Sequence, residues 1–199
     1  MTQAMSGTTQ DIALFPLNTV LFPGGLLPLR IFEPRYVDMI GRCMRANEVF
    51  GVVLIDGGGD TQREVATATI GTAARVVDFQ SLADGLLGLL CRGERRFRIE
   101  ARSRRDDGLN CATVAWIEEF TRVPLATQYR PLVPLLRQAM SNLTTIGGFL
   151  EPDYDDSAWV GHRLAELLPL DQSVQQHLLE IDDPEARLRL LAPLIEAQA

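Results

Sequence analysis

The chain has 199 residues, a formal net charge of −7 and 46% hydrophobic residues. This length is sufficient to bury a core, and the composition is ordinary for a globular protein. The negative charge argues against general nucleic-acid affinity, and no apolar run approaches the roughly 20 residues that a membrane-spanning helix needs.

All nineteen basic residues are arginine, and lysine is absent. A Walker A phosphate loop uses a lysine to reach the phosphates, so ATP hydrolysis by that route is excluded. A Ser–Lys catalytic dyad and a Schiff-base lysine are excluded for the same reason.

Cysteine and histidine are few and scattered: Cys43, Cys91, Cys111, His162 and His177. They form no CxxC pair and no spaced His/Cys ligand set, so no metal site and no cofactor are expected. The scattered positions of the cysteines favour small buried thiols, and a reactive thiol is the alternative. No GxSxG nucleophile elbow occurs. The chain is therefore predicted not to be an enzyme.

The first structured block spans residues 14–36 and is divided by three prolines and a Gly-Gly turn. Proline cannot donate to a sheet ladder, so the strands here are short and bent. We expect strands at Ala13–Leu17, Val20–Phe22 and Leu26–Phe32. Pro34 is typical of a first helical position, and a helix is predicted from Pro34 to about Asn47.

Short apolar segments separated by turn signals follow. Asp56–Asp60 predicts a loop, Asp84-Gly85 and Asp106–Gly108 predict turns, and Gly93 predicts a break in the chain. With the first block, this rhythm predicts a closed or nearly closed β barrel over residues 10–120. The expected strands are Val49–Ile55, Ala66–Ile70, Gly71–Phe79, Leu86–Cys91, Phe97–Ala101 and Cys111–Ile117.

Beyond Pro124 the apolar period becomes helical, which predicts a helical lobe over residues 125–197. Ser157, Asp171 and Asp183 are the expected N-caps of the last three helices, and Pro193 is expected to kink or shorten the last one. The predicted helices span 131–143, from Ser157 through Leu168, 172–181, and from Pro184 onward.

Four short motifs occur in order in the first block: Phe15-Pro16-Leu17, Phe22-Pro23-Gly24, Leu27-Pro28-Leu29 and Ile31-Phe32-Glu33-Pro34-Arg35-Tyr36. Together with the segments 70–79, 86–99 and 167–191, this order resembles the Lon protease N-terminal domain family over roughly residues 12–195. The chain is similar to free-standing Lon-substrate-binding-domain proteins. The resemblance implies an α+β fold: a PUA-like β pseudo-barrel with one inserted helix, followed by a C-terminal helical bundle.

The resemblance also implies a function and a partner class. A Lon-like substrate-recognition domain would bind unfolded or exposed-hydrophobic polypeptides and be related to a protease system, without ATPase or peptidase parts of its own. The expected surface is an apolar groove with a polar rim, between barrel and helices. Residues 1–10 show no signal-peptide pattern, so a cytoplasmic location without membrane association is expected.

Four residues of the first block are candidate peptide-binding residues: Leu26, Leu27, Glu33 and Arg35. The two leucines follow the Gly-Gly turn and present apolar side chains, although core packing is the alternative. Glu33 and Arg35 flank the helix start, where they form either a lip of the binding surface or a local ion pair.

Two charged clusters need a separate interpretation. Strand alternation would place Arg96, Arg98 and Arg102 on one face, and this arginine-rich strand supports an alternative function in which the barrel binds a small molecule or RNA. Acidic residues interrupt the cluster, so a salt-bridged face is favoured. The carboxylates of 151–156 are expected to form a solvated linker and a helix cap rather than a cation or acid–base site.

Overall fold

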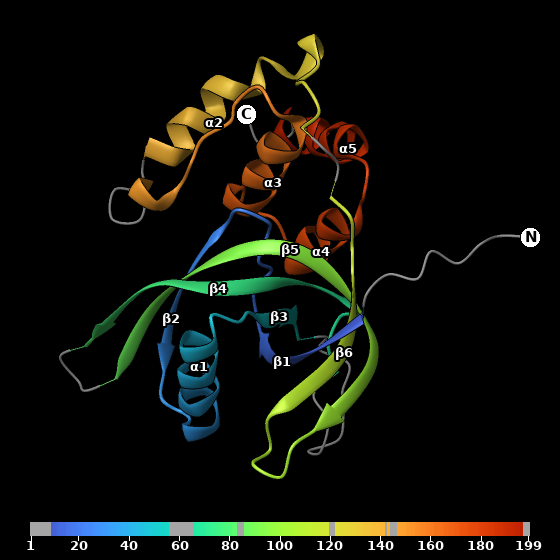
Figure 1. Ribbon diagram of the computed structural model, residues 1–199. Helices are drawn as coiled ribbons and strands as arrows, with labels where there is room; N and C mark the ends of the chain where they lie inside the picture. The colour runs from blue at the N-terminus through green and yellow to red at the C-terminus, as the bar shows by residue number, and fades with distance from the viewer. Residues whose placement is uncertain are drawn as a thin grey trace, which may run out of the picture.

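The computed structural model describes residues 9–55, 66–82, 86–119, 122–141, 143 and 147–196. The predicted loop at Asp56–Asp60 and the predicted turn at Asp84-Gly85 lie outside the described residues. A curved sheet with one helix forms one half of the molecule, and the remaining helices lie together on one side of that sheet (Figure 1).

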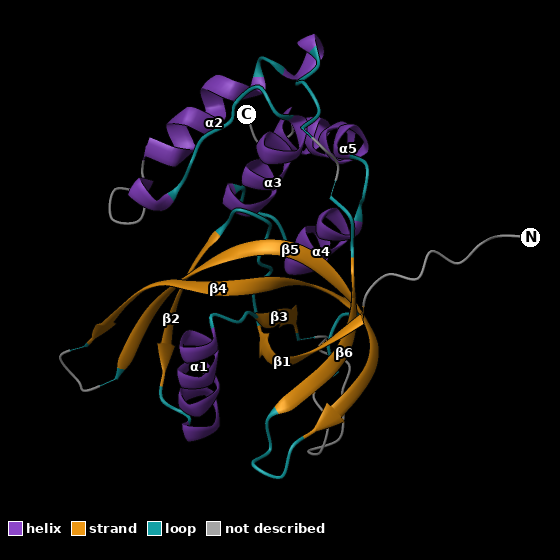
Figure 2. Ribbon diagram, viewed as in Figure 1, coloured by secondary structure: helices purple, strands orange, loops and turns teal. Residues whose placement is uncertain are grey.

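Figure 2 distinguishes the helices (purple) from the strands (orange). The strands are β1 (Thr9–Leu17), β2 (Leu26–Ile31), β3 (Phe50–Leu54), β4 (Ile70–Ser81), β5 (Leu87–Arg104) and β6 (Asn110–Trp116). The α-helices are α1 (Pro34–Ala46), α2 (Leu132–Ser141), α3 (Ser157–Leu167), α4 (Gln172–Glu180) and α5 (Pro184–Glu196), and two 3₁₀ turns are η1 (Thr127–Tyr129) and η2 (Gly147–Phe149).

Strand pairing closes the sheet on itself. The order is β2-β5-β4-β3-β1-β6, and β5 also pairs with β6. The pairs are antiparallel except β1–β3, which is parallel and is connected through β2 and α1. Closure removes sheet edges that would otherwise be left unpaired. The predicted barrel-like closure is therefore present, with β2 added beside the first half of β5.

β5 is one continuous strand, and the predicted break at Gly93 is wrong. A Cβ at Gly93 would lie 2.3 Å from the carbonyl oxygen of Phe22, so the glycine allows a loop to approach the strand. The backbone N–H of Gly24 donates to Gly93 O and Gly93 N–H donates to Gly25 O, both at 2.8 Å. Glycine here serves close backbone approach rather than a turn.

Two other strand predictions also differ from the structure. Val20–Phe22 is an irregular buried segment rather than a strand, because it turns under the helices instead of joining the ladder. Most of the strand predicted at Ala66–Ile70 does not form. Only Ile70 belongs to a strand, as the first residue of β4, and Thr67 forms an isolated bridge to Ile55.

Phe97 lies in the barrel interior with no exposed surface. A Cβ at Gly71 would lie 2.8 Å from the Phe97 ring and one at Gly51 would lie 2.7 Å from it. Both strands therefore pass over the ring only because these positions carry no side chain.

α1 begins at Pro34, as predicted, and ends where Asn47 adopts a left-handed conformation with φ of 53°. Asparagine tolerates this conformation better than most residues. Its buried face packs onto the barrel with β1, β2 and β5. That face consists of Tyr36, Met39, Ile40 and Cys43.

The helical layer shares a core with the barrel. One cluster of buried residues joins Val20, Phe22 and Ile70 of the barrel half to helix residues such as Leu164 and Leu188. Because neither half buries these side chains alone, the predicted lobes at 10–120 and 125–197 meet in a common hydrophobic interior.

Helix starts are set by particular side chains. Asp156, rather than the predicted Ser157, caps α3: its carboxylate accepts from Trp159 N–H at 2.9 Å. Asp171 occupies the N-cap of α4 without a side-chain cap hydrogen bond. Asp183 accepts from Glu185 N–H at 3.0 Å at the start of α5. Pro193 lies inside α5, which continues to Glu196.

Candidate functional site

A hollow of about 520 Å³ lies where α1 begins beside the ends of β1 and β2; we call it the α1 hollow. Residues of β1, β2 and the start of α1 form most of its wall, and Ile55 and the β5–β6 hairpin contribute the remainder. Its lining residues are Phe15, Pro16, Leu17, Leu29, Arg30, Ile31, Phe32, Glu33, Arg35, Tyr36, Ile55, Arg104 and Asn110.

The floor of the α1 hollow is apolar. Phe15 and Ile31 are buried, whereas Phe32 is 70% exposed. The polypeptide turns from β2 into α1 at Phe32, so this ring has no strand or helix packed over it. An exposed aromatic ring beside an apolar hollow is a typical feature of a binding surface.

The rim of the hollow is polar and predominantly cationic. Arg35 forms an ion pair with Glu33 at 2.7 Å, and its Nη1 donates to the carbonyl oxygen of Gly108 at 3.0 Å. Arg104 also donates from Nε to Gly108 O, at 3.2 Å. These bonds tie the start of α1 to the β5–β6 turn. The buried Nε of Arg35 has no hydrogen-bond partner among the described residues.

Tyr36 stands between the floor and the rim. Its ring centroid lies 4.2 Å from that of Phe15, and the guanidinium of Arg35 lies 4.8 Å from the Tyr36 ring centroid. Burial raises the pKa of the Tyr36 hydroxyl above its ordinary value. The side chain is therefore a neutral phenol at pH 7.

Of the four residues that the sequence singles out, the structure brings two to the α1 hollow. Glu33 and Arg35 line it together. Leu26 is buried, and Leu27 is partly buried and packs against the core cluster beneath α1; neither lines the hollow. Both leucines pair with β5, opposite Arg92 and Cys91.

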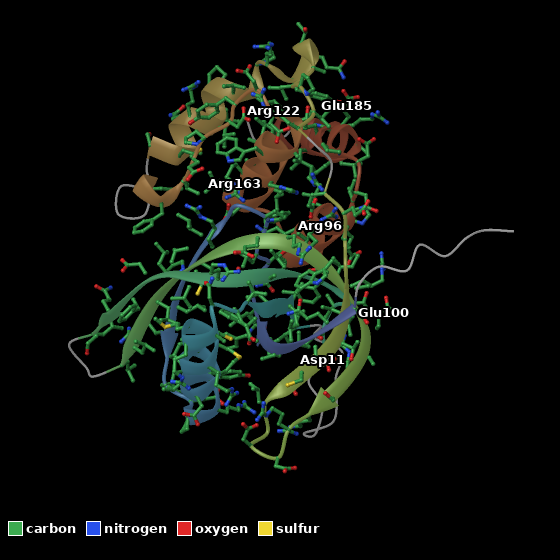
Figure 3. All side chains as sticks on the ribbon, in the orientation of Figure 1. Asp11, Arg96, Glu100, Arg122, Arg163 and Glu185 are labelled. Carbon is green, nitrogen blue, oxygen red and sulfur yellow. The ribbon has the colours of Figure 1, made fainter. Side chains whose placement is uncertain are left out.

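The arginine-rich strand does not present one face of arginines. Arg96 is fully buried between the sheet and the helices (Figure 3), whereas Arg98 and Arg102 are exposed. Arg102 donates to the hydroxyl and carbonyl of Thr67, and Arg95 stacks 4.0 Å from the Trp116 ring centroid. Arg96 is not available on the surface beside Arg98 and Arg102, because Leu179, Ile181 and Asp182 cover its guanidinium.

The carboxylates of the 151–156 segment are engaged in structure. Asp153 pairs with Arg122 at 2.7 Å, which lowers the pKa of the Asp153 carboxyl. Asp155 pairs with Arg130 at 3.4 Å. Across the described residues, no group of three or more His, Cys, Asp or Glu side chains is arranged to hold a metal ion.

The three cysteine thiols are free. Burial raises the pKa of each, and that of Cys91 reaches about 12. A thiol with a raised pKa carries little thiolate at pH 7, and thiolate is the nucleophilic form. The cysteines thus behave as small apolar side chains.

A second hollow, of about 540 Å³, lies between α4 and the end of β3. This is the region between barrel and helices where the sequence analysis placed an apolar groove. Its lining is mostly polar: Leu54, Ile55, Thr67, Ala68, Thr69, Gln172, Ser173, Gln176, His177 and Glu180. The more apolar hollow lies at α1 instead.

Sequence analysis missed Phe32 and Arg104 as residues of the α1 hollow. Phe32 is the last residue of the strand predicted at Leu26–Phe32. The alternation of side chains along a strand does not indicate that the chain turns there and exposes the ring. Arg104 reaches the hollow through a hairpin about 70 residues away in sequence. The motif from Ile31 to Tyr36 was the available signal for Phe32.

A family model described as the ATP-dependent protease La (LON) substrate-binding domain matches residues 11–197, nearly the whole chain. The chain belongs to this family. Its members' shared domain is a substrate-binding one, which agrees with a surface hollow that has an apolar floor.

Similar proteins support the same assignment. A crystal structure titled Lon N-terminal domain protein, from Xanthomonas campestris, is 38% identical, with a TM-score of 0.74 over 92% of this chain and 96% of that chain. The N-terminal domain of a Mycobacterium avium complex Lon protease has 16% identity and a TM-score of 0.59 over 92% of this chain and 96% of that one, which supports the fold alone.

Lon protease 2 of Myxococcus xanthus is 27% identical over 195 residues, which are 94% of this chain. The Lon protease of Escherichia coli K12 is 25% identical over 204 residues. The chain spans about a quarter of the length of these curated relatives, 23% and 25% respectively. Among the residues that the structure describes, no helix has the length and apolar character to cross a membrane.

Proposed function

We propose that this chain is a non-catalytic polypeptide-recognition module that binds unfolded or exposed-hydrophobic segments at the α1 hollow. It would act in the cytoplasm as an adaptor or competitor for clients of a protease system. We also propose that the barrel is PUA-like and that the C-terminal helices form a helical bundle. The family model, which describes a substrate-binding domain, supports the proposed class of ligand.

The observation that carries the proposal is the α1 hollow with Phe32 at its edge. A volume of about 520 Å³ accommodates several apolar side chains rather than one. Phe32 is 70% exposed, so its ring is available to pack on an incoming side chain. Burial of apolar surface contributes roughly 25 cal/mol per Å², which favours clients that expose large side chains.

The rim suits the backbone of an extended client. The Arg35 side chain is 29% exposed at this rim, and an unfolded segment presents carbonyl oxygens that accept hydrogen bonds from a guanidinium. Glu33 fixes Arg35 from the other side at 2.7 Å. Leu26 and Leu27 would support the hollow from within, by holding β2 against β5.

Phe32→Ser tests the proposal, with Phe79→Ser as the matched control. Phe79, on β4, is 60% exposed and does not line the α1 hollow. Anisotropy of a labelled, permanently unfolded polypeptide measures binding. We expect Phe32→Ser to weaken binding roughly tenfold, equivalent to about 1.4 kcal/mol at a contact hot spot. Phe79→Ser should bind within about twofold of the unchanged protein, the variation expected of a residue outside the contact.

Equal losses in the two variants would contradict the proposed location, because general surface hydrophobicity would then explain the binding. Labelled single-stranded RNA, titrated in parallel, tests the alternative function. Arg96 and Arg102 are already bonded within the protein, which makes the arginine-rich strand a weaker basis for RNA contact. Salt-sensitive RNA binding without polypeptide binding would favour that alternative.

A further inference from the structure

A small pocket of about 230 Å³ lies on the helical side of the molecule; we call it the α3–α5 pocket. It forms where the Pro23-Gly24 turn meets the first turns of α3 and α5. Its lining residues are Pro23, Gly24, Glu119, Asp156, Ala158, Trp159, His162, Asp182, Pro184 and Arg187. None of these lines the α1 hollow, so the two are separate.

Arg187 brings a buried, incompletely bonded guanidinium to this pocket. The residue is 1% exposed and donates to the carbonyl oxygens of Leu178, at 2.9 Å, and Ile181. Its Nη1 has no hydrogen-bond partner among the described residues. Burial, followed by repulsion from Arg96, lowers the pKa of Arg187 to about 10, so the group stays charged at pH 7.

The carboxylates of Glu119 and Asp182, which lie near Arg187, pair with Arg96. Glu119 accepts from Arg96 Nε at 2.9 Å, and Asp182 lies 3.1 Å from Arg96 Nη2. A buried donor that lacks an acceptor destabilises the folded protein, and an incoming acceptor would relieve that cost. Arg187 lines the pocket, and its buried Nη1 is a guanidinium donor without an acceptor among the described residues.

His162 brings a second polar atom without a partner. The residue is 5% exposed, and its Nε2 has no hydrogen-bond partner among the described residues. Burial, with repulsion from Arg187, Arg163 and Arg96, lowers the pKa of His162 well below its ordinary value. A neutral imidazole has one N–H and one lone pair, so this ring can accept a hydrogen bond.

The charge of the lining selects against an anion. Glu119 and Asp182 pair with Arg96, and Asp156 accepts from the N–H groups of Val123 and Trp159, so three carboxylates lie in the lining. A carboxylate ligand would meet these three carboxylates beside the Arg187 guanidinium, whose charge Glu119, Asp182 and Asp183 already offset in part. A neutral group that both accepts and donates fits these partners better.

We propose that the α3–α5 pocket binds a neutral amide group, whose carbonyl oxygen accepts from Arg187 Nη1 and whose N–H donates to His162 Nε2. The volume is smaller than that of pockets for drug-sized ligands, so it suits one amide side chain or one backbone unit of a polypeptide. Trp159, Pro23 and Pro184 provide the apolar wall. Amide binding here stands independently of polypeptide capture at the α1 hollow.

Nitrogen NMR of ¹⁵N-histidine-labelled protein tests this directly, because the chain has only two histidines. Propionamide and propionate form a matched amide–carboxylate pair of probes, and N-acetylalanine-N-methylamide supplies a backbone amide. We expect a saturable shift of the His162 Nε2 signal with an amide, none with propionate, and an unmoved signal from the exposed His177. The stronger of the two amides identifies a side-chain or a backbone source.

Ala158→Leu fills the pocket from its wall without touching the buried network, and Ala139→Leu on α2 is the matched control. Ala158→Leu should weaken the amide response at least fivefold, and Ala139→Leu should leave it unchanged. No saturable His162 shift in the unsubstituted protein, or an equal response to propionate, would overturn the proposal. Because that measurement uses the unsubstituted protein, poor folding of Ala158→Leu would not obscure the result.

Discussion

Buried arginines hold the two halves of the molecule together at the residue scale. Arg96 of β5 donates to Leu179 O, at 2.8 Å, and to Ile181 O, at 3.2 Å, as well as pairing with Glu119. Arg163 of α3 donates to Pro23 O in the β1–β2 loop at 3.0 Å. Each guanidinium thus satisfies carbonyl groups that the packing of helices on the barrel would otherwise leave without partners.

Arg96→Met should lower the free energy of unfolding by about 3 kcal/mol, because it leaves two carbonyls and a partly buried carboxylate without their donor. Arg98→Met is the control: Arg98 lies two residues away on the same strand and is exposed. Its effect should stay within about 0.5 kcal/mol. Urea unfolding measures both. Similar losses in the two variants would contradict a special role for the buried guanidinium.

His162 should make stability depend on pH. Burial lowers its pKa well below 6.5, so as pH falls through 6.5 the unfolded chain gains a proton that the folded protein does not. Stability is therefore lost on acidification. Between pH 7.5 and 5.5 the unsubstituted protein should lose about 1.4 kcal/mol more than His162→Gln.

Urea unfolding at the two pH values measures this difference. His177→Gln is the matched control, because His177 is exposed on α4 and the substitution is the same. It should keep the full pH dependence. An unchanged pH dependence in His162→Gln would show that the imidazole is not held neutral in the folded state.

At the scale of elements, the start of α3 depends on one carboxylate with two bonds. Asp156 accepts from Trp159 N–H and from Val123 N–H, both at 2.9 Å, so it joins the helix to the segment that leaves the barrel. Asp156→Ala should cost about 1–2 kcal/mol of unfolding free energy. Asp171→Ala, at the N-cap of α4, should cost less because Asp171 makes no side-chain cap bond. Thermal or urea unfolding compares them, and equal costs would contradict the assigned bond.

Helices and strands were predictable where local signals decide them. Pro34 indicated the start of α1, and the apolar period with the expected caps Ser157, Asp171 and Asp183 indicated α3 to α5. The errors arose where tertiary contact overrides a local signal. Gly93 indicates a chain break by its local sequence. The strand nevertheless continues through Gly93, where the Phe22 carbonyl packs against the backbone. Ser157 and Asp156 are both residue types that cap helices. Asp156 is the cap here because its carboxylate accepts from Trp159 N–H and Val123 N–H, while the Ser157 hydroxyl donates to Pro124 O.

At the scale of the whole molecule, the order of short motifs predicted the family and the general architecture. It did not locate the site, because the α1 hollow joins the β2–α1 junction to a hairpin that begins about 70 residues later. The hydrogen bond from Arg35 to Gly108 O exists only after that hairpin folds over. The binding surface is a property of the closed sheet rather than of one segment.

Amide hydrogen exchange of the full chain, with and without saturating unfolded polypeptide, tests the central claim most directly. The account predicts slower exchange in residues 29–36 and in the 104–110 hairpin, with no change around Phe79. Bound polypeptide that leaves residues 29–36 unprotected, or that protects the β4 surface around Phe79 instead, would contradict recognition at the α1 hollow.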